Sequence, residues 1–140
     1  MTRKTIYIYD IKNSARLQMA EGFAREYLDI DEWTVRTGGR ERKLLHPLAT
    51  KAMDEVGVDI RNQTANLVDL SLINHADYII NLSGSIEQNF RNLKTNARLE
   101  AWSFEEPERA EGSEENQLVV FRRVRDAINN RMKEFAQVEG

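Results

Sequence analysis

The sequence predicts an α/β protein with three layers, αβα, around a central four-stranded parallel sheet. Short β-branched and aromatic runs alternate along the chain with longer segments in which apolar residues recur at helical spacing. This alternation is typical of parallel sheets with helices on both faces. The chain has 140 residues, of which 41% are hydrophobic and 31% are charged, so we expect residues 1–140 to form a single domain.

The expected strands and helices follow from these patterns. Ser113 has the residue type of a helix N-cap, and Pro47 suits the first turn of a helix. Residues 84–96 are polar and are assigned to neither a helix nor a loop. The expected strands are 5–9, 33–37, 77–82 and 99–104, and the expected helices are 15–28, 47–56, 66–73 and a long last helix from 113 to 135.

A tight connection joins the first expected strand to the first expected helix. Such a turn points backbone N–H groups and the positive end of the helix dipole into one small space, which suits an anion. Arg16 in the first helical turn adds a planar guanidinium group. A phosphate-like or sulfate-like oxyanion is the ligand that such a loop would take. The expected anion-binding loop consists of Ile11, Lys12, Asn13, Ser14, Ala15 and Arg16.

Composition excludes several classes of function. The net charge of −3 gives no support to nucleic-acid binding, which needs a basic face. No apolar run approaches roughly 18 residues, so we expect a cytoplasmic protein with no membrane contact. The absence of cysteine excludes disulfides and thiolate metal sites in this chain. His46 and His75 lack ligand spacing, and we expect neither a metal site nor a cofactor.

The loop also resembles a known family. The six-residue step from Asp10 to Arg16 and the residues up to Gly22 resemble the phosphate loop of thioredoxin-coupled arsenate reductases, which share the low-molecular-weight protein tyrosine phosphatase fold. The family loop reads Cys-x5-Arg, with the cysteine as nucleophile, and this chain has Asp10 at that position. The resemblance covers nearly the whole chain, including 52–60, 62–64, 76–77, 102–104 and 121–126, and it implies a low-molecular-weight phosphatase-like fold.

The departures from the family pattern gather at the site. Lys12 replaces a glycine and Leu17 replaces a serine that supports the thiolate. The resemblance implies that the family's general acid, Asp-Pro, corresponds to Glu106 followed by a proline. The lost redox positions, where the resemblance implies cysteines, are Ala15, Ser83 and Phe90.

The resemblance also implies a structural potassium site. The matching positions are Asn13, Glu21 and Thr37. Asn66, however, stands where a carboxylate is expected. The potassium site is therefore a weak candidate.

Three arrangements are open for Asp10. The one we favour has its carboxylate accept loop N–H groups and pair with Arg16, so that the site is filled from within. In the second, the loop still binds phosphate or sulfate weakly with help from Lys12. In the third, Asp10 is a nucleophile. There its charge would face a dianionic phosphate at about 4 Å, at a cost of roughly 1 kcal/mol per charge pair in water and several at an effective dielectric of about 20.

The expected function follows from the missing thiols. Thiol-based arsenate reduction needs a thiolate and a second thiol, and neither exists in this chain. We expect a catalytically inactive homologue of arsenate reductase and tyrosine phosphatase that acts as a binding or regulatory module with an unidentified protein partner. The alternative is a residual phosphate-ester hydrolase or phospho-acceptor that uses Asp10 with Glu106 as acid. Deliberate removal of the cysteines is a third reading, which we do not favour because Ser or Ala would be the usual replacements.

Overall fold

A four-stranded parallel sheet forms the centre of the fold. The computed structural model describes residues 3–12, 14–41, 44–83 and 95–140. The strands lie in the order β2-β1-β3-β4, and each neighbouring pair is parallel. Their bounds are β1 Lys4–Tyr9, β2 Trp33–Gly38, β3 Tyr78–Asn81 and β4 Arg98–Ala101.

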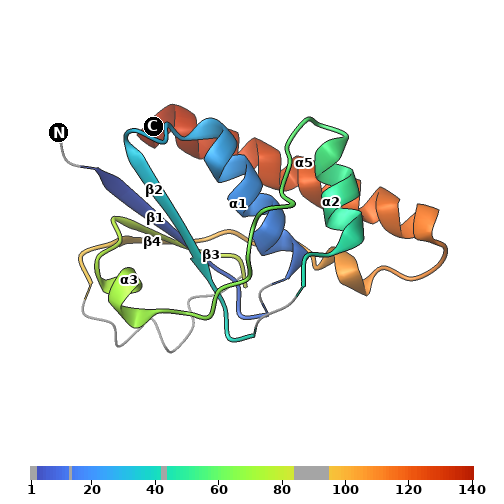
Figure 1. Cartoon of the computed structure of the whole chain (residues 1–140), viewed down its shortest axis with the longest axis horizontal. Helices are drawn as coiled ribbons and strands as arrows, with labels where there is room; N and C mark the ends of the chain where they lie inside the picture. Colours follow the sequence, from blue (N-terminus) through green and yellow to red (C-terminus); the bar gives the residue numbers. More distant parts are fainter. Residues whose placement is uncertain (1–2, 13, 42–43, 84–94) are drawn as a thin grey trace.

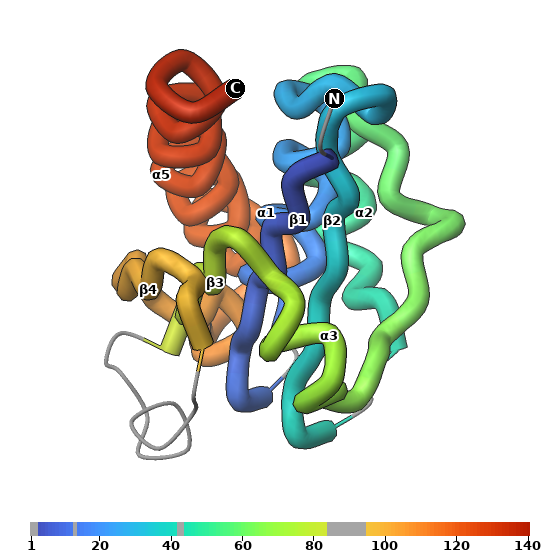
Figure 2. Tube along the Cα trace, turned by 90° about the vertical axis from the view of Figure 1, so that its left-hand side faces the viewer, coloured from blue at the N-terminus to red at the C-terminus, as the bar shows by residue number. Residues whose placement is uncertain are grey.

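Helices cover both faces of this sheet. Figure 1 shows α1 (Ala15–Tyr27), α2 (Pro47–Asp54) and α5 (Glu114–Glu139) on one side, and the short α3 (Leu70–Asn74) on the other. Figure 2, turned by 90°, shows β4, β3, β1 and β2 side by side in the order of the sheet. The expected αβα layering is confirmed.

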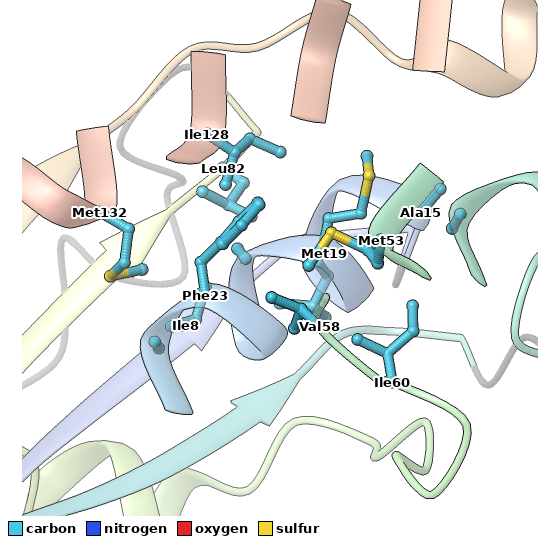
Figure 3. Packing of buried hydrophobic residues seen from close by; sticks show 14 of the residues in the cluster. Ile8, Ala15, Met19, Phe23, Met53, Val58, Ile60, Leu82, Ile128 and Met132 are labelled. Atoms are coloured by element: carbon cyan, nitrogen blue, oxygen red, sulfur yellow. The ribbon is translucent and has the colours of Figure 1, made fainter. Parts of the chain in front are cut away.

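The main core lies between the sheet and the three helices α1, α2 and α5. Met19 and Phe23 of α1 pack there with Met53 of α2 and with Ile128 and Met132 of α5 (Figure 3). A smaller cluster fills the opposite face and consists of Tyr7, Tyr9, Ile73, Ala76 and Ile79. The central strand β1 contributes to both clusters, which explains why its apolar run does not alternate with polar residues.

α1 and α2 approach each other closely at a glycine. A Cβ atom added to Gly22 would lie 2.7 Å from Ile60 Cγ2 and 2.9 Å from Met53 Cε. Glycine has a low helix propensity, but at position 22 of α1 the absence of a side chain leaves room for Ile60 and Met53. This packing fixes the direction of α1, and with it the position of the loop that precedes the helix.

Two expected elements differ most from the structure; in addition, α2 ends at Asp54 rather than at residue 56, and α5 continues to Glu139. The helix expected at 66–73 is confined to α3, because Leu67 instead forms a parallel bridge with Gly39 and Asp69 caps the shorter helix through Ser71 N and Leu72 N. The last strand ends at Ala101 rather than at residue 104. Most of the unassigned segment 84–96 lies outside the described residues.

Other sequence expectations are confirmed. Ser113 caps α5 by accepting a hydrogen bond from Asn116 N at 3.1 Å, and Pro47 occupies the first turn of α2. In the part of the chain that the structure describes, no helix combines the length and the apolar character needed to cross a bilayer.

Candidate functional site

The expected anion-binding loop lies at the carboxyl edge of the sheet, between β1 and α1. Asp10 N donates to Gly38 O at 3.2 Å, and Arg40 N donates to Ile11 O at 3.0 Å, so the turn after β2 supports one side of the loop. Ile11 N donates to Ser83 Oγ at 3.0 Å at the end of β3. Backbone of the turn after β2 and the Ser83 hydroxyl after β3 therefore fix the loop that follows β1, at the edge where open parallel sheets bind ligands.

Asp10 lies inside the loop and is completely buried. Its Oδ2 accepts hydrogen bonds from Arg16 Nε at 2.9 Å and from Ser14 Oγ at 2.5 Å. Its Oδ1 accepts from Arg16 Nη2 at 3.1 Å and from Lys12 N at 3.3 Å. The two-point contact with the guanidinium is the geometry in which arginine binds carboxylates most strongly. Asp10 thus takes up donors that would otherwise face an anion.

Arg16 is itself almost buried and is held by two further groups. Its Nη1 donates to Phe104 O at 2.6 Å, and its Nη2 lies 3.7 Å from Glu106 Oε1. Glu106 Oε2 also lies 3.4 Å from Lys12 Nζ and 3.4 Å from Arg109 Nε. Glu106 is therefore beside the loop, as the resemblance implied, but it is engaged with three cations.

A residue that the sequence reasoning missed also reaches the loop. Glu108 lies in the short helix η1 (Pro107–Arg109), and its Oε2 accepts a hydrogen bond from Ala15 N at 2.7 Å. Ala15 N is the first amide of α1, where the dipole favours a negative charge. The acidic run 105–108 was the only available signal, and spacing alone does not say which acid faces the loop.

The structure brings only some of the lost redox positions together. Ala15 and Ser83 both lie at the loop, Ala15 as the start of α1 and Ser83 as the acceptor for Ile11 N. Asn13 and Phe90 lie outside the described residues. The side chain of Lys12 is 41% exposed and reaches toward Glu106.

Glu21, the carboxylate of the potassium candidate, already pairs with an arginine. Thr37 Oγ1 donates to Glu21 Oε1 at 3.3 Å, so these two positions are neighbours. Arg25 Nε, however, pairs with Glu21 Oε2 at 3.0 Å, and the amide nitrogen of Asn66 faces Thr37 Oγ1 at 3.5 Å. The buried carboxylate thus already has a guanidinium beside it, and Asn13 of the candidate set lies outside the described residues, so the potassium site stays a weak prediction. Within the described ranges, no group of three or more His, Cys, Asp or Glu side chains could hold a metal.

A separate groove of about 1190 Å³ runs along the outer edge of β2. Thr37 and Arg36 line it from the strand, and Leu67 and Leu70 line it from the segment that leads into α3. None of the residues that line this groove belongs to the loop 10–16. The groove is therefore distinct from the loop, although Glu21 and Thr37 of the potassium candidate also line it.

Comparisons with known proteins agree with this architecture. A family model described as "Low molecular weight phosphotyrosine protein phosphatase" matches residues 5–139. The arsenate reductase of Bacillus subtilis (strain 168) is 45% identical over 137 residues, which cover 98% of each chain. The arsenate reductase of Shouchella clausii (strain KSM-K16) is 44% identical over the same share of each chain.

Solved structures give the same result. The structure titled "An arsenate reductase in reduced state" superimposes with a TM-score of 0.76 at 29% identity and covers 98% of this chain and 99% of its own. "An arsenate reductase in the phosphate binding state" gives 0.74 at 28% identity, with the same coverage. The tyrosine phosphatase amsI of Erwinia amylovora gives 0.77 at 14% identity, covers 98% of this chain and 93% of its own, and supports the fold alone.

Proposed function

The chain belongs to the low molecular weight phosphotyrosine protein phosphatase family, and we propose that it is a catalytically inactive relative of arsenate reductase that acts as a binding or regulatory module. A cytoplasmic location is part of this proposal. Two properties of the sequence support it. Asp10 stands where the family has its nucleophilic cysteine. The chain contains no cysteine, so no thiol at another position could take over the role of the nucleophile. Reduction of arsenate through a thiolate and a disulfide therefore has no starting group here.

The observation that carries the proposal is the hydrogen bonding of Asp10. Each of its two carboxylate oxygens accepts two hydrogen bonds, from Arg16 and Lys12 N on Oδ1 and from Arg16 and Ser14 on Oδ2. A carboxylate oxygen has two lone pairs, so neither oxygen keeps one free for attack on phosphorus. The side chain is also fully buried. Asp10 is thus suited to close the loop and poorly suited to be a nucleophile.

The same contacts argue against tight oxyanion binding by the closed loop. One of the similar solved structures is an arsenate reductase in the phosphate binding state, and this comparison suggests phosphate as the class of ligand. In this chain an incoming phosphate would compete with Asp10 for Arg16, and its charge would face the buried carboxylate. We therefore propose that the loop binds phosphate weakly or not at all while Asp10 keeps these bonds.

A phosphate-ester hydrolase or phospho-acceptor is the second candidate. The observation in its favour is the position of Glu106, whose carboxylate lies beside Arg16 and Lys12 at the mouth of the loop, where a proton donor for a leaving group would stand. In this mechanism Asp10 would first have to leave Arg16 and Ser14. An activity that depends on both carboxylates would favour this candidate.

One pair of measurements decides between the two candidates. Hydrolysis of an aryl phosphate is measured with and without Mg²⁺, and the backbone amides of residues 11–16 are followed by NMR as inorganic phosphate and then arsenate are added. We expect no turnover and no saturable shift below millimolar anion. Asp10→Ser should bind phosphate at least about tenfold more tightly, a change of ~1.4 kcal/mol.

The opposite outcomes would overturn the proposal. Turnover by the unmodified chain that disappears in Asp10→Ser would make Asp10 a nucleophile. A fall in phosphate affinity in Asp10→Ser would show that the carboxylate does not block the loop. A matched variant is Asp29→Ser, which removes an exposed acid beyond the end of α1 and should leave phosphate binding unchanged.

A further inference from the structure

One acidic segment covers the outer side of the loop. We name residues 104–109 the acidic strap. From this strap Phe104 O accepts from Arg16 Nη1, Glu106 pairs with Arg16 and Lys12, and Glu108 accepts from Ala15 N. The strap thus contacts Lys12 Nζ, the Arg16 guanidinium and the first amide of α1 from the side of the loop opposite to Asp10.

The contact made by Glu108 resembles that of a bound anion. At 2.7 Å its Oε2 forms a short, charge-assisted hydrogen bond with Ala15 N. Its other oxygen, Oε1, is buried and has no hydrogen-bond partner in the described part of the chain. A buried carboxylate oxygen without a hydrogen-bond partner is unfavourable, and here only one of the two oxygens of Glu108 accepts a hydrogen bond. An oxyanion could offer oxygens to Ala15 N and to the nearby cations at the same time.

The strap is anchored to the rest of the fold as well as to the loop, because Phe104 packs against the main core. Glu105 pairs with Arg123 of α5 at 2.8 Å, but the two side chains are 49% and 61% exposed, and such exposed pairs contribute little. Pro107 is buried and Arg109 is exposed. The contacts from Glu106 and Glu108 to the loop therefore add to these anchors in positioning the strap.

We propose that the acidic strap is a built-in competitor for oxyanions, with Glu108 as its main ligand group. This inference rests on the proposed function, in which Asp10 closes the inner part of the loop. Glu108 and Glu106 close the outer part, at Ala15 N and at the Lys12 and Arg16 cations. A tetrahedral oxyanion such as inorganic phosphate binds the loop only when the strap moves away. Replacement of Asp10 alone therefore restores only part of the binding capacity.

The test compares variants that share the same open inner site. Inorganic phosphate is titrated into Asp10→Ser, into Asp10→Ser with Glu108→Ala, and into Asp10→Ser with Glu111→Ala, with the Ala15 amide followed by NMR. Glu111 is an exposed acid just beyond the strap and is the matched control for charge. We expect Glu108→Ala to tighten phosphate binding by at least about tenfold, ~1.4 kcal/mol, and Glu111→Ala to leave it nearly unchanged.

A second readout needs no ligand. In the otherwise unmodified chain, Glu108→Ala should move the Ala15 amide proton upfield, because the amide loses a short hydrogen bond to a carboxylate. If Glu108→Ala does not fold, Glu108→Gln keeps the size of the side chain, removes its charge, and should shift phosphate affinity in the same direction. Equal phosphate affinity with and without the Glu108 substitution, in a folded protein, would refute the competitor role.

Failure of this inference is distinct from failure of the proposed function. The inference depends only on the difference that Glu108 makes in the Asp10→Ser background. The proposed function depends on turnover and phosphate binding by the unmodified chain. If the unmodified chain shows neither turnover nor phosphate binding, and Glu108→Ala does not change phosphate affinity, the competitor role of the strap is refuted. The role of Asp10 in closing the loop is then retained.

Discussion

Arg16→Ala is expected to destabilise this protein strongly. The substitution removes the guanidinium that forms two hydrogen bonds with Asp10, at 2.9 and 3.1 Å, and one with Phe104 O at 2.6 Å. Asp10 is completely buried and the Arg16 side chain is only 7% exposed, so water cannot replace the lost partner. Removing one member of a buried ion pair typically costs about 3–5 kcal/mol because the other charge stays buried and unpaired. We expect a loss in this range.

Urea unfolding followed by tryptophan fluorescence measures this loss at neutral pH. The free energy of unfolding of a domain of this size is about 5–15 kcal/mol, so the change is large on that scale. Arg61→Ala is the matched control, because Arg61 also pairs with two carboxylates, Asp54 and Asp59, but is 54% exposed. The control should leave the free energy of unfolding within experimental error.

A double-mutant cycle separates the ion pair from simple loss of packing. Asp10→Ala with Arg16→Ala removes both charges, so the double variant should lose less stability than the sum of the two single variants. A loss below about 1 kcal/mol for Arg16→Ala, which is the size of an ordinary neutral hydrogen bond, would refute the buried pair. Additive single effects would refute the coupling between Asp10 and Arg16.

Three further predictions concern the scaffold. Hydrogen bonds from Arg122, and then from Arg125, lower the pKa of Glu55 from 4.5 to about 2. The stabilisation is therefore fully present above pH 4.5 and is lost as the pH falls through about 2, so Glu55→Gln should cost at most about 1 kcal/mol at neutral pH in urea unfolding, and this cost should shrink as the pH falls below 4.5. Gly22→Ala should cost about 1–2 kcal/mol, because contact with Ile60 outweighs the gain in helix propensity, and an unchanged unfolding midpoint would contradict the packing. The hydrogen bond to Glu139 raises the pKa of Tyr78 to about 12, so Glu139→Gln should lower this pKa toward 10 in a phenolate absorbance titration.

The sequence predicted the parts of the site that depend on neighbouring residues. Asp10 and Arg16 are six residues apart across a strand–turn–helix connection, and this local geometry alone brings the two side chains together. The parallel sheet of four strands was also expected from the alternation of strands and helices, whereas the strand order β2-β1-β3-β4 was not predicted. Local spacing was sufficient to predict the pair of Asp10 and Arg16 because both residues lie in the connection between β1 and α1 or in the first turn of α1.

The missed residue depends on contacts between distant parts of the chain. Glu108 and Ala15 are 93 residues apart, and the sequence pointed to another acid, because the resemblance singled out Glu106 and spacing alone does not distinguish the acids at 105, 106 and 108. The turn of η1 decides among them: Glu106 and Glu108 reach the loop, and Glu105 pairs with α5. The shortened α3 has the same kind of cause, because pairing of Leu67 with Gly39 overrides the helical spacing of residues 66–69.

The burial of Arg16 explains why a carboxylate, and not a small neutral residue, suits position 10. Serine or alanine at position 10 would leave the nearly buried guanidinium with Phe104 O and the more distant Glu106, 3.7 Å away, as its partners. Asp10 supplies the missing charge and satisfies Ser14 and the Lys12 amide as well. An acidic residue at position 10 therefore suits the nearly buried guanidinium better than a small neutral residue does.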